Sequence, residues 1–268
     1  MNDSPRKHTS SIDKLRHIMR QLRHPETGCP WDLKQSFATI APYTIEEAYE
    51  VEDAIARNNL ADLKDELGDL LFQVVFHAQL AEELGIFNFD DVAEAVSQKM
   101  ERRHPHVFDA VDVENADDVV QNWEAIKAKE RSEKAIGIAS LMDDIPASLP
   151  ALSQAVKIQK RAADVGFDWP TVDPIFEKLA EETDELRLEI NQGSDKTRLQ
   201  DELGDMLFVL ANLARKLNLD PEQATRSTNR KFIKRFQWME NQTNLSSMSL
   251  GEQEALWQKA KAQNQNES

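Results

Sequence analysis

The heptapeptide ELGDLLF, residues 66–72, returns as ELGDMLF at residues 202–208 with one conservative change. Repeats are the first feature to seek in a sequence, because they reveal the unit from which a fold is built. A Glu-Glu-x-x-Glu run precedes each copy, within YTIEEAYEVEDA at 43–54 and LAEETDELRLEI at 179–190. The chain therefore carries the same two acidic segments twice, in the same order.

The repeat extends beyond these segments. Two tryptophans and a Lys-x-x-x-Arg pair recur in the same order, 132 to 138 residues apart: Trp31 with Trp169, Trp123 with Trp257, and Lys99 and Arg103 with Lys231 and Arg235. We interpret the chain as a tandem duplication of one module. Because two prolines interrupt the helical pattern near its middle, we place an N-terminal module at 1–136, a linker at 137–150 and a C-terminal module at 151–268.

The composition predicts an all-α, helical-bundle fold for both modules. Only eight of the 268 residues are glycine, and apolar residues recur at helical spacing without a long period-two run. Thr44 is the expected N-cap of one helix, with Glu47 at the N3 position of a capping box. The expected helices cover about 11–23, 44–58, 60–84, 90–103, 117–133, 149–164, 173–191, 195–218, 221–241 and 250–263.

The charge and the apolar runs exclude several classes of partner. A formal charge of −16 argues against a nucleic-acid polymer or an anionic membrane, since both require a basic face. No apolar run approaches the roughly 18 residues of a membrane span, and the first residues lack the apolar core of a signal peptide. One cysteine, Cys29, rules out an intramolecular disulfide framework and fits a cytoplasmic protein.

The acidic segments predict a metal site in each module. Residues three or four apart share one face of a helix, and short connections pack consecutive helices antiparallel. Four carboxylates in one small volume require a compensating cation, and an all-oxygen set without histidine suits Mg²⁺ or Mn²⁺. The two sets are Glu47, Glu50, Glu66 and Asp69 in the first module, and Glu182, Glu185, Glu202 and Asp205 in the second.

Two other interpretations of the acidic segments stay open. A Glu-Glu-x-x-Glu run taken alone is more often a solvated helix face, as in a non-catalytic interaction scaffold. A di-iron carboxylate bundle also uses paired glutamates, but it normally requires Glu-x-x-His. Metal ligation is favoured because the acids of the heptapeptides run straight into the apolar stretches LLFQVVF and MLFVLANL, where an unpartnered charge is costly.

Cationic and aromatic residues point to a phosphorylated ligand. Lys231 and Arg235 lie four apart and project from one helix face, and arginine suits bidentate phosphate contacts. Trp257 either stacks on a base or fills a core. A metal-bound nucleotide polyphosphate would use all of these groups. His104 and His106 flank a proline in RRHPHVF, and we interpret them as a structural turn rather than as ligands.

The motifs GCPWD, EExxE, ELGDLLF and ERRHPHVF together closely resemble the MazG nucleoside triphosphate pyrophosphohydrolases in their long, tandem-domain form. The resemblance covers essentially the whole chain after about residue 10. It implies an all-α fold whose paired helices hold Mg²⁺, and a homodimer. It also implies hydrolysis of NTPs and dNTPs between the α- and β-phosphates, giving NMP and pyrophosphate.

Carried over by position, the resemblance implies that both carboxylate sets ligate metal. In the second module it adds a group of nucleotide contacts, namely Lys178, Arg198, Lys231, Arg235 and Trp257. Glu46 and Glu181 would hold a further ion or the attacking water. The first module has Tyr43, beside Pro42, where the second has Lys178. We therefore expect the second module to be the main catalytic site, and the first to serve other nucleotides, binding without turnover, or assembly.

Overall fold

The computed structural model describes residues 10–109, 115, 119, 122–123, 126–127, 130 and 140–265. Every regular element among these residues is a helix, which confirms the all-α prediction. The chain divides into two compact units, Met1–Lys134 and Ala135–Ser268, and each is described by itself. None of the described helices is long and apolar enough to cross a membrane.

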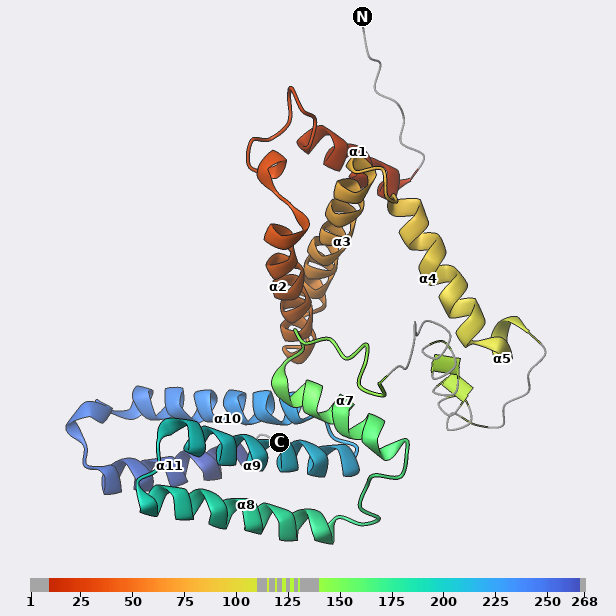
Figure 1. Ribbon diagram of the computed structural model, residues 1–268. Helices are drawn as coiled ribbons and strands as arrows, with labels where there is room; N and C mark the ends of the chain where they lie inside the picture. The colour runs from red at the N-terminus through yellow and green to blue at the C-terminus, as the bar shows by residue number, and fades with distance from the viewer. Residues whose placement is uncertain are drawn as a thin grey trace, which may run out of the picture. The chain divides into compact units, whose positions relative to one another are not determined.

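Unit 1 is built around a pair of long helices. Short helices precede this pair and follow it, and the elements in order are α1 (Ser11–Leu22), η1 (Asp32–Lys34), α2 (Phe37–Ala56), α3 (Leu60–Glu83), α4 (Phe89–Arg103) and α5 (Pro105–Phe108). Helices α2 and α3 lie side by side (Figure 1). The turn between them is short because Asn58 adopts a left-handed φ of 54° and Asn59 caps α3. The hairpin thereby faces the two acidic segments of the unit toward each other.

The predicted start of α2 at Thr44 was wrong. Ser36 is the N-cap, and it forms a capping box with Thr39, whose hydroxyl accepts from the Ser36 backbone N–H at 2.8 Å. Pro42 then lies inside the helix. Because proline has no backbone N–H, about one helical hydrogen bond is lost there, and the loss is tolerated so near the N-terminus. Glu47 is consequently an interior residue of α2, and its carboxylate is not needed for capping.

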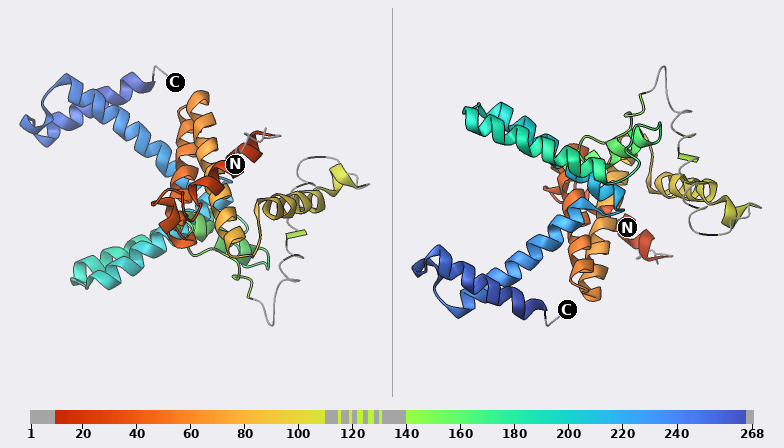
Figure 2. Two further views of the ribbon diagram at one scale, coloured as in Figure 1. Left: turned by 90° about the horizontal axis from the view of Figure 1, so that it is seen from above. Right: turned by 90° about the horizontal axis from the view of Figure 1, so that it is seen from below.

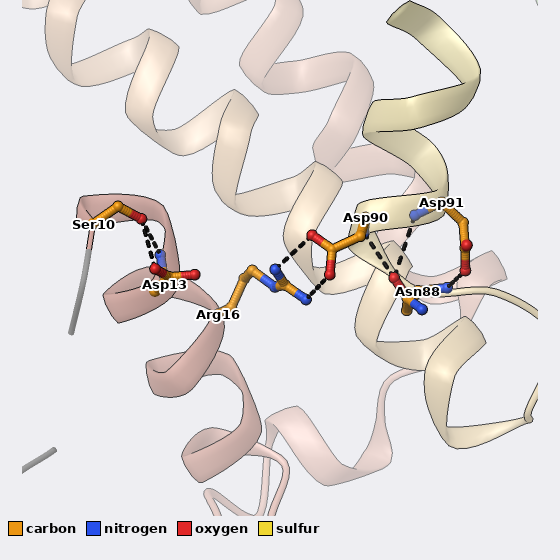
Figure 3. A network of polar contacts seen from close by, with 6 residues as sticks. All are labelled: Ser10, Asp13, Arg16, Asn88, Asp90 and Asp91. Carbon is orange, nitrogen blue, oxygen red and sulfur yellow. Dashed lines mark hydrogen bonds and ion pairs between the residues drawn. The ribbon is translucent and has the colours of Figure 1, made fainter. Parts of the chain in front are cut away.

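A small apolar core holds α1 and α4 to the α2–α3 hairpin, and an ion pair joins α1 to α4. The core consists of Met19, Ile40, Val75, Phe76 and Leu80, all at most 6% exposed. Arg16 on α1 donates two hydrogen bonds, of 2.7 and 2.8 Å, to the carboxylate of Asp90 at the start of α4 (Figure 3). Figure 3 also shows Asn88 capping α4, which therefore begins one residue before the predicted position.

Unit 2 contains an equivalent pair of long helices and a second helical hairpin. Its elements are α7 (Ala151–Ala163), α8 (Asp173–Gln192), α9 (Lys196–Lys216), α10 (Pro221–Gln242), η2 (Leu245–Ser247) and α11 (Leu250–Gln265). Helix α8 ends at Gly193, which takes a φ of 69°, and Asp195 caps α9. Helices α8 and α9 run side by side, as do α10 and α11 (Figure 2).

Most remaining boundaries agree with the sequence to within two residues. The predicted helix at 149–164 begins only at Ala151, because Pro150 precedes it, and the one at 195–218 ends at Lys216. The helix expected at 117–133 lies largely outside the described residues, as does the start of the predicted linker. His104 ends α4, its ring Nδ1 lies 2.7 Å from the Met100 carbonyl oxygen, and α5 begins at Pro105, so the predicted turn is a break between two helices.

Candidate active site

The α8–α9 hairpin gathers acidic side chains into one small volume. One oxygen from each of Glu182, Glu185 and Glu202 lies within 4.8 Å of the others. We call these three residues the unit 2 trio. Asp205, the fourth predicted member, is not within this distance set, but it lines the same pocket as Glu182. The acidic residues that lie three apart on each helix therefore come together as expected, except that Asp205 lies at the margin of the trio.

Glu182 is the most buried member of the unit 2 trio. It is 4% exposed, and its Oε2 has no hydrogen-bond partner among the described residues. Burial raises the pKa of the neighbouring Glu185 carboxyl, as do the charge and hydrogen bond of Glu182 and the charge of Glu202. A buried oxygen without a partner, beside mutually repelling carboxylates, is the environment that a hard cation would relieve.

Two cations already lie against the unit 2 trio. Lys178 Nζ is 2.8 Å from Glu181 and 2.6 Å from Glu182, and the hydrogen bonds that it donates to Glu181 and then to Glu182 raise the pKa of Lys178. Arg198 lies 3.6 Å from Glu202 and 2.9 Å from Glu189. Lys178 and Arg198, predicted as nucleotide contacts, thus pair with carboxylates here. They form a positively charged edge to the trio that a phosphate group could approach.

The α2–α3 hairpin of unit 1 holds a matching trio. One oxygen from each of Glu47, Glu66 and Asp69 lies within 4.8 Å of the others, and Glu50 is the member left outside this set. Burial raises the pKa of Glu47, followed by its hydrogen bond to Glu50 and the charge of Asp69. The pKa of Glu66 is raised by burial and then by the charges of Glu50 and Asp69. Unit 1 therefore has the same crowding of negative charge.

Unit 1 lacks the two cations of unit 2. Tyr43 stands at the position of Lys178 and packs edge-on against Trp31, with ring centroids 6.0 Å apart. Asp62 stands at the position of Arg198 and pairs instead with Arg57 at 2.8 Å. No ion pair within the described part of the chain involves a carboxylate of the unit 1 set. The two sites are therefore alike in their acids but unlike in their counter-charges.

Both trios fit a divalent cation by ligand chemistry. Each offers three carboxylate oxygens within reach of one ion, and neither contains a histidine. Such oxygen-only sets suit Mg²⁺ or Mn²⁺ and disfavour the imidazole-containing sites of di-iron bundles. The unpartnered Glu182 oxygen adds a structural reason in unit 2.

A pocket of about 680 Å³ adjoins the unit 2 trio. Lys178, Glu182 and Asp205 line it together with mostly apolar side chains of α7, α9 and the loop between α7 and α8. Two buried amides, Gln159 and Asn212, also line it, and neither is among the site residues predicted from the sequence. The repeat could have revealed these two residues, because the positions that align with them in the first module hold apolar residues.

The predicted contacts on α10 and α11 form a separate cluster. The Arg235 guanidinium carbon lies 5.8 Å from the Trp257 ring centroid, and the Phe232 ring packs against the same ring at a tilt of 44°, with centroids 4.9 Å apart. Arg235 Nε is buried and has no partner among the described residues, while Lys231 is exposed. None of Lys231, Arg235 and Trp257 lines the pocket beside the trio. Their contact with a nucleotide stays a prediction.

The unit 1 counterpart of this cluster is already neutralised in part. Arg103 pairs with Glu130 at 2.6 Å, and Arg102 contacts the same carboxylate at 2.7 Å. Hydrogen bonds from Arg103 and then Arg102 hold the pKa of Glu130 at about 2. Lys127 Nζ lies 3.7 Å from the ring centroid of Trp123. Arg103, the counterpart of Arg235, is thus held by a carboxylate, whereas Lys99 is exposed like its counterpart Lys231.

Comparison with known proteins gives one consistent result. The family model of the MazG nucleotide pyrophosphohydrolase domain matches the chain twice, over residues 35–108 and 171–239. An Escherichia coli (strain K12) protein named nucleoside triphosphate pyrophosphohydrolase is 51% identical over 260 residues, or 95% of this chain and 98% of that protein. Each matched segment contains one carboxylate trio.

Two Thermotoga maritima proteins are also similar. One, named nucleoside triphosphate pyrophosphohydrolase/pyrophosphatase MazG, is 42% identical over 93% of this chain and 95% of its own length. The other is a solved structure of a MazG-related protein, 28% identical, with a TM-score of 0.37 over 46% of this chain and 99% of that chain.

Proposed function

Because the chain belongs to the MazG family of nucleotide pyrophosphohydrolases, we propose that it hydrolyses NTPs and dNTPs between the α- and β-phosphates, giving NMP and pyrophosphate. The family match confirms the resemblance that the sequence motifs indicated. One observation carries the proposal: the unit 2 trio, with an unpartnered buried oxygen on Glu182, lies beside Lys178 at the edge of a large pocket.

The carboxylates of unit 2 would hold the metal of this reaction. Glu182, Glu185 and Glu202 are the proposed ligands of Mg²⁺ or Mn²⁺, and Asp205 completes the set from the pocket side. Such an ion, when bound, would neutralise the charge of a triphosphate and polarise the phosphorus that is attacked. In unit 1 the equivalent ligands are Glu47, Glu50, Glu66 and Asp69.

Other charged residues of α8 and α9 would accept the proton of the attacking water and stabilise the charge on the phosphates. Glu181, which is exposed and hydrogen-bonded to Lys178, is the proposed base that accepts a proton from the attacking water. The water attacks the α-phosphorus, the bond to the bridging oxygen breaks, and pyrophosphate leaves. Lys178 and Arg198 exchange their carboxylate partners for phosphate oxygens and stabilise the negative charge that develops on them.

In a homodimer, the separate cluster on α10 and α11 could contact the nucleotide bound by the other copy. Within one chain, Lys231, Arg235 and Trp257 do not line the pocket, so in a dimer the second copy would bring these residues to the nucleotide. The paired hairpins support assembly, because each leaves the same apolar positions exposed by 41–50%: Leu67 and Leu71 in unit 1, and Leu203 and Leu207 in unit 2. Apolar surface of this kind is normally covered by a partner.

Cellular context follows from charge and composition. The net charge of −16 supports a small anionic substrate held through metal rather than a nucleic-acid polymer. The single cysteine fits a reducing compartment, and we place the reaction in the cytoplasm.

The decisive experiment follows the oxygen of the attacking water. The purified chain is incubated with each NTP and dNTP in ¹⁸O-labelled water with Mg²⁺, and the products are separated and weighed by mass spectrometry. We expect pyrophosphate and NMP, with the label only in NMP, and no turnover after chelation with EDTA. Release of orthophosphate, or label in pyrophosphate, would contradict attack at the α-phosphorus.

A further inference from the structure

The duplication provides an internal comparison for the pocket beside the unit 2 trio. Helix α7 begins 140 residues after α1, and the heptapeptide on α9 lies 136 residues after that on α3. By these offsets Met19 corresponds to Gln159, and Phe76 corresponds to Asn212. Met19 and Phe76 are 0% and 1% exposed and belong to the core of unit 1. Large apolar side chains therefore fill this position in unit 1.

Unit 2 replaces both core residues with amides and leaves space around them. Gln159 and Asn212 are 8% and 7% exposed, and both line the pocket of about 680 Å³. A buried amide is costly unless its polar atoms are paired, so two amides at former core positions require a reason. The rest of the lining, which includes Trp169 and Phe208, offers ring and apolar surface against which a flat ligand can pack.

Neighbouring groups fix which atom of each amide remains available. Gln159 Nε2 donates to the Phe208 backbone carbonyl at 2.7 Å, so Oε1 is the acceptor left over, and it has no partner among the described residues. Asn212 Oδ1 accepts two hydrogen bonds from Arg215, of 2.9 and 2.8 Å, which leaves Nδ2 as its donor. Arg215 is in turn held by Asp168. The pocket thus offers one fixed acceptor and one fixed donor.

We infer that this pocket holds the nucleobase of the substrate, and that Gln159 and Asn212 are its specificity-determining residues. The inference rests on the proposed function, because the same pocket reaches Lys178 and Glu182 beside the trio. Every common nucleobase carries a donor next to an acceptor on its Watson–Crick edge, which proteins read by hydrogen bonds. The pair therefore favours a base that presents these groups and rejects a ring of the same shape that lacks them.

The test compares dTTP with the triphosphate of a difluorotoluene deoxynucleoside, which copies the shape of thymine but hydrogen-bonds weakly. Both kcat/KM with Mg²⁺ and the calorimetric Kd of the uncleavable α,β-imido forms are measured on the full chain. For the wild type we expect a preference for the thymine compound of about 5- to 150-fold per lost hydrogen bond. In Gln159→Met, which installs the unit 1 residue, the preference should fall toward one.

The same helix offers a matched control. Gln154 on α7 is half-buried, its Nε2 donates to the Pro146 carbonyl at 3.3 Å, and it does not line the pocket, so Gln154→Met should keep the wild-type preference. Asn212→Leu is a second variant, which tests the inference if Gln159→Met does not fold. It should also reduce the preference for dTTP over its analogue. Equal treatment of the two compounds by the wild type, or an unchanged preference in both folded variants, overturns the inference.

The outcomes also separate this inference from the proposed function. If neither triphosphate is cleaved but the imido forms still show the preference in Kd, the proposed reaction fails and the base pocket stands. If dTTP and its analogue are cleaved equally well, the reaction stands and the base pocket fails.

Discussion

Lys178 Nζ lies 2.6 Å from a carboxylate oxygen of Glu182, one helical turn further along α8. Glu182 is 4% exposed, whereas the lysine side chain is one-third exposed. A flexible cation with a strongly hydrated head group thus partly neutralises a nearly buried acid from the solvent side. In unit 1 the equivalent residue is Tyr43, and this difference between the units underlies the first prediction.

Replacing Lys178 with Met should affect both stability and substrate binding. The buried Glu182 loses its counter-charge, so we expect the metal-free protein to lose about 1–3 kcal/mol of unfolding free energy. The KM for NTP should rise by about tenfold or more, because a phosphate contact worth at least 1.4 kcal/mol is lost. Urea denaturation with EDTA and steady-state kinetics measure the two effects.

Arg187→Met is the control for Lys178→Met. Arg187 forms an ion pair with Asp184 on the same helix, but both side chains are at least 70% exposed. Such pairs contribute at most about 1 kcal/mol and commonly nothing measurable. An equal loss of stability in both variants would contradict a special role for Lys178.

Charge removal without loss of shape should distinguish the two trios. Glu182→Gln keeps the fold but removes a proposed metal ligand, and we expect kcat to fall by about 10³-fold or more, a barrier increase of about 4 kcal/mol. Glu47→Gln should leave most of the turnover, since unit 1 has Tyr43 and Asp62 where unit 2 has the cations Lys178 and Arg198. Pyrophosphate release by each variant and by the double variant decides this. Wild-type rates in Glu182→Gln and in the double variant would remove both assignments.

Metal should stabilise the protein more at high pH than at low pH. Burial and neighbouring carboxylates raise the pKa values of Glu47, Glu66 and Glu185 above the ordinary 4.5. The folded state then holds protons more tightly than the unfolded state, so these groups reduce stability as pH rises through the window above 4.5. Mg²⁺ should raise Tm by several degrees at pH 8 and by less at pH 5, as seen by calorimetry. The Glu47→Gln, Glu182→Gln double variant should show no such shift.

An ion pair in unit 1 should show the opposite pH dependence. The hydrogen bond from Arg23 lowers the pKa of Glu83, and the Arg23 side chain is only 7% exposed. The stabilisation is therefore present above the unfolded pKa of about 4.5 and is lost as pH falls below it. Arg23→Met should cost about 1–3 kcal/mol at pH 7 and less at pH 3. In Arg57→Met, whose ion pairs are about half exposed, urea denaturation should show a much smaller change at both pH values.

Two glycines should respond to alanine in opposite directions. A Cβ on Gly28 would lie 2.6 Å from the His24 carbonyl oxygen and 2.8 Å from the His24 nitrogen, both rigid backbone atoms. We expect Gly28→Ala to lower the free energy of unfolding by about 1–3 kcal/mol. Gly68 is inside α3 with nothing within 4 Å of its Cβ position, so Gly68→Ala should raise it by about 0.5–1 kcal/mol. Thermal melts of the two variants would show whether the signs differ.

The spacing of acidic residues predicted much of the candidate site. Glu182 and Glu185 are three apart, as are Glu202 and Asp205, and a helix necessarily turns each pair to one face. The start of α2 was predicted wrongly because Thr44 with Glu47 resembles a capping box, whereas Ser36 supplies an earlier cap that tolerates Pro42. Local patterns of this kind compete with one another, and the sequence alone does not rank them.

By itself the sequence determined the helical class, the duplication and the identity of the acidic faces, because periodicity and repetition are properties of the chain. Only the tertiary structure decided that Asp205 lies at the margin of its trio, that Lys178 pairs with Glu182, and that Gln159 and Asn212 line a pocket where unit 1 has a core. These depend on distances between side chains of different turns and helices. Such distances are set by how the helices pack, and no spacing along the chain encodes them directly.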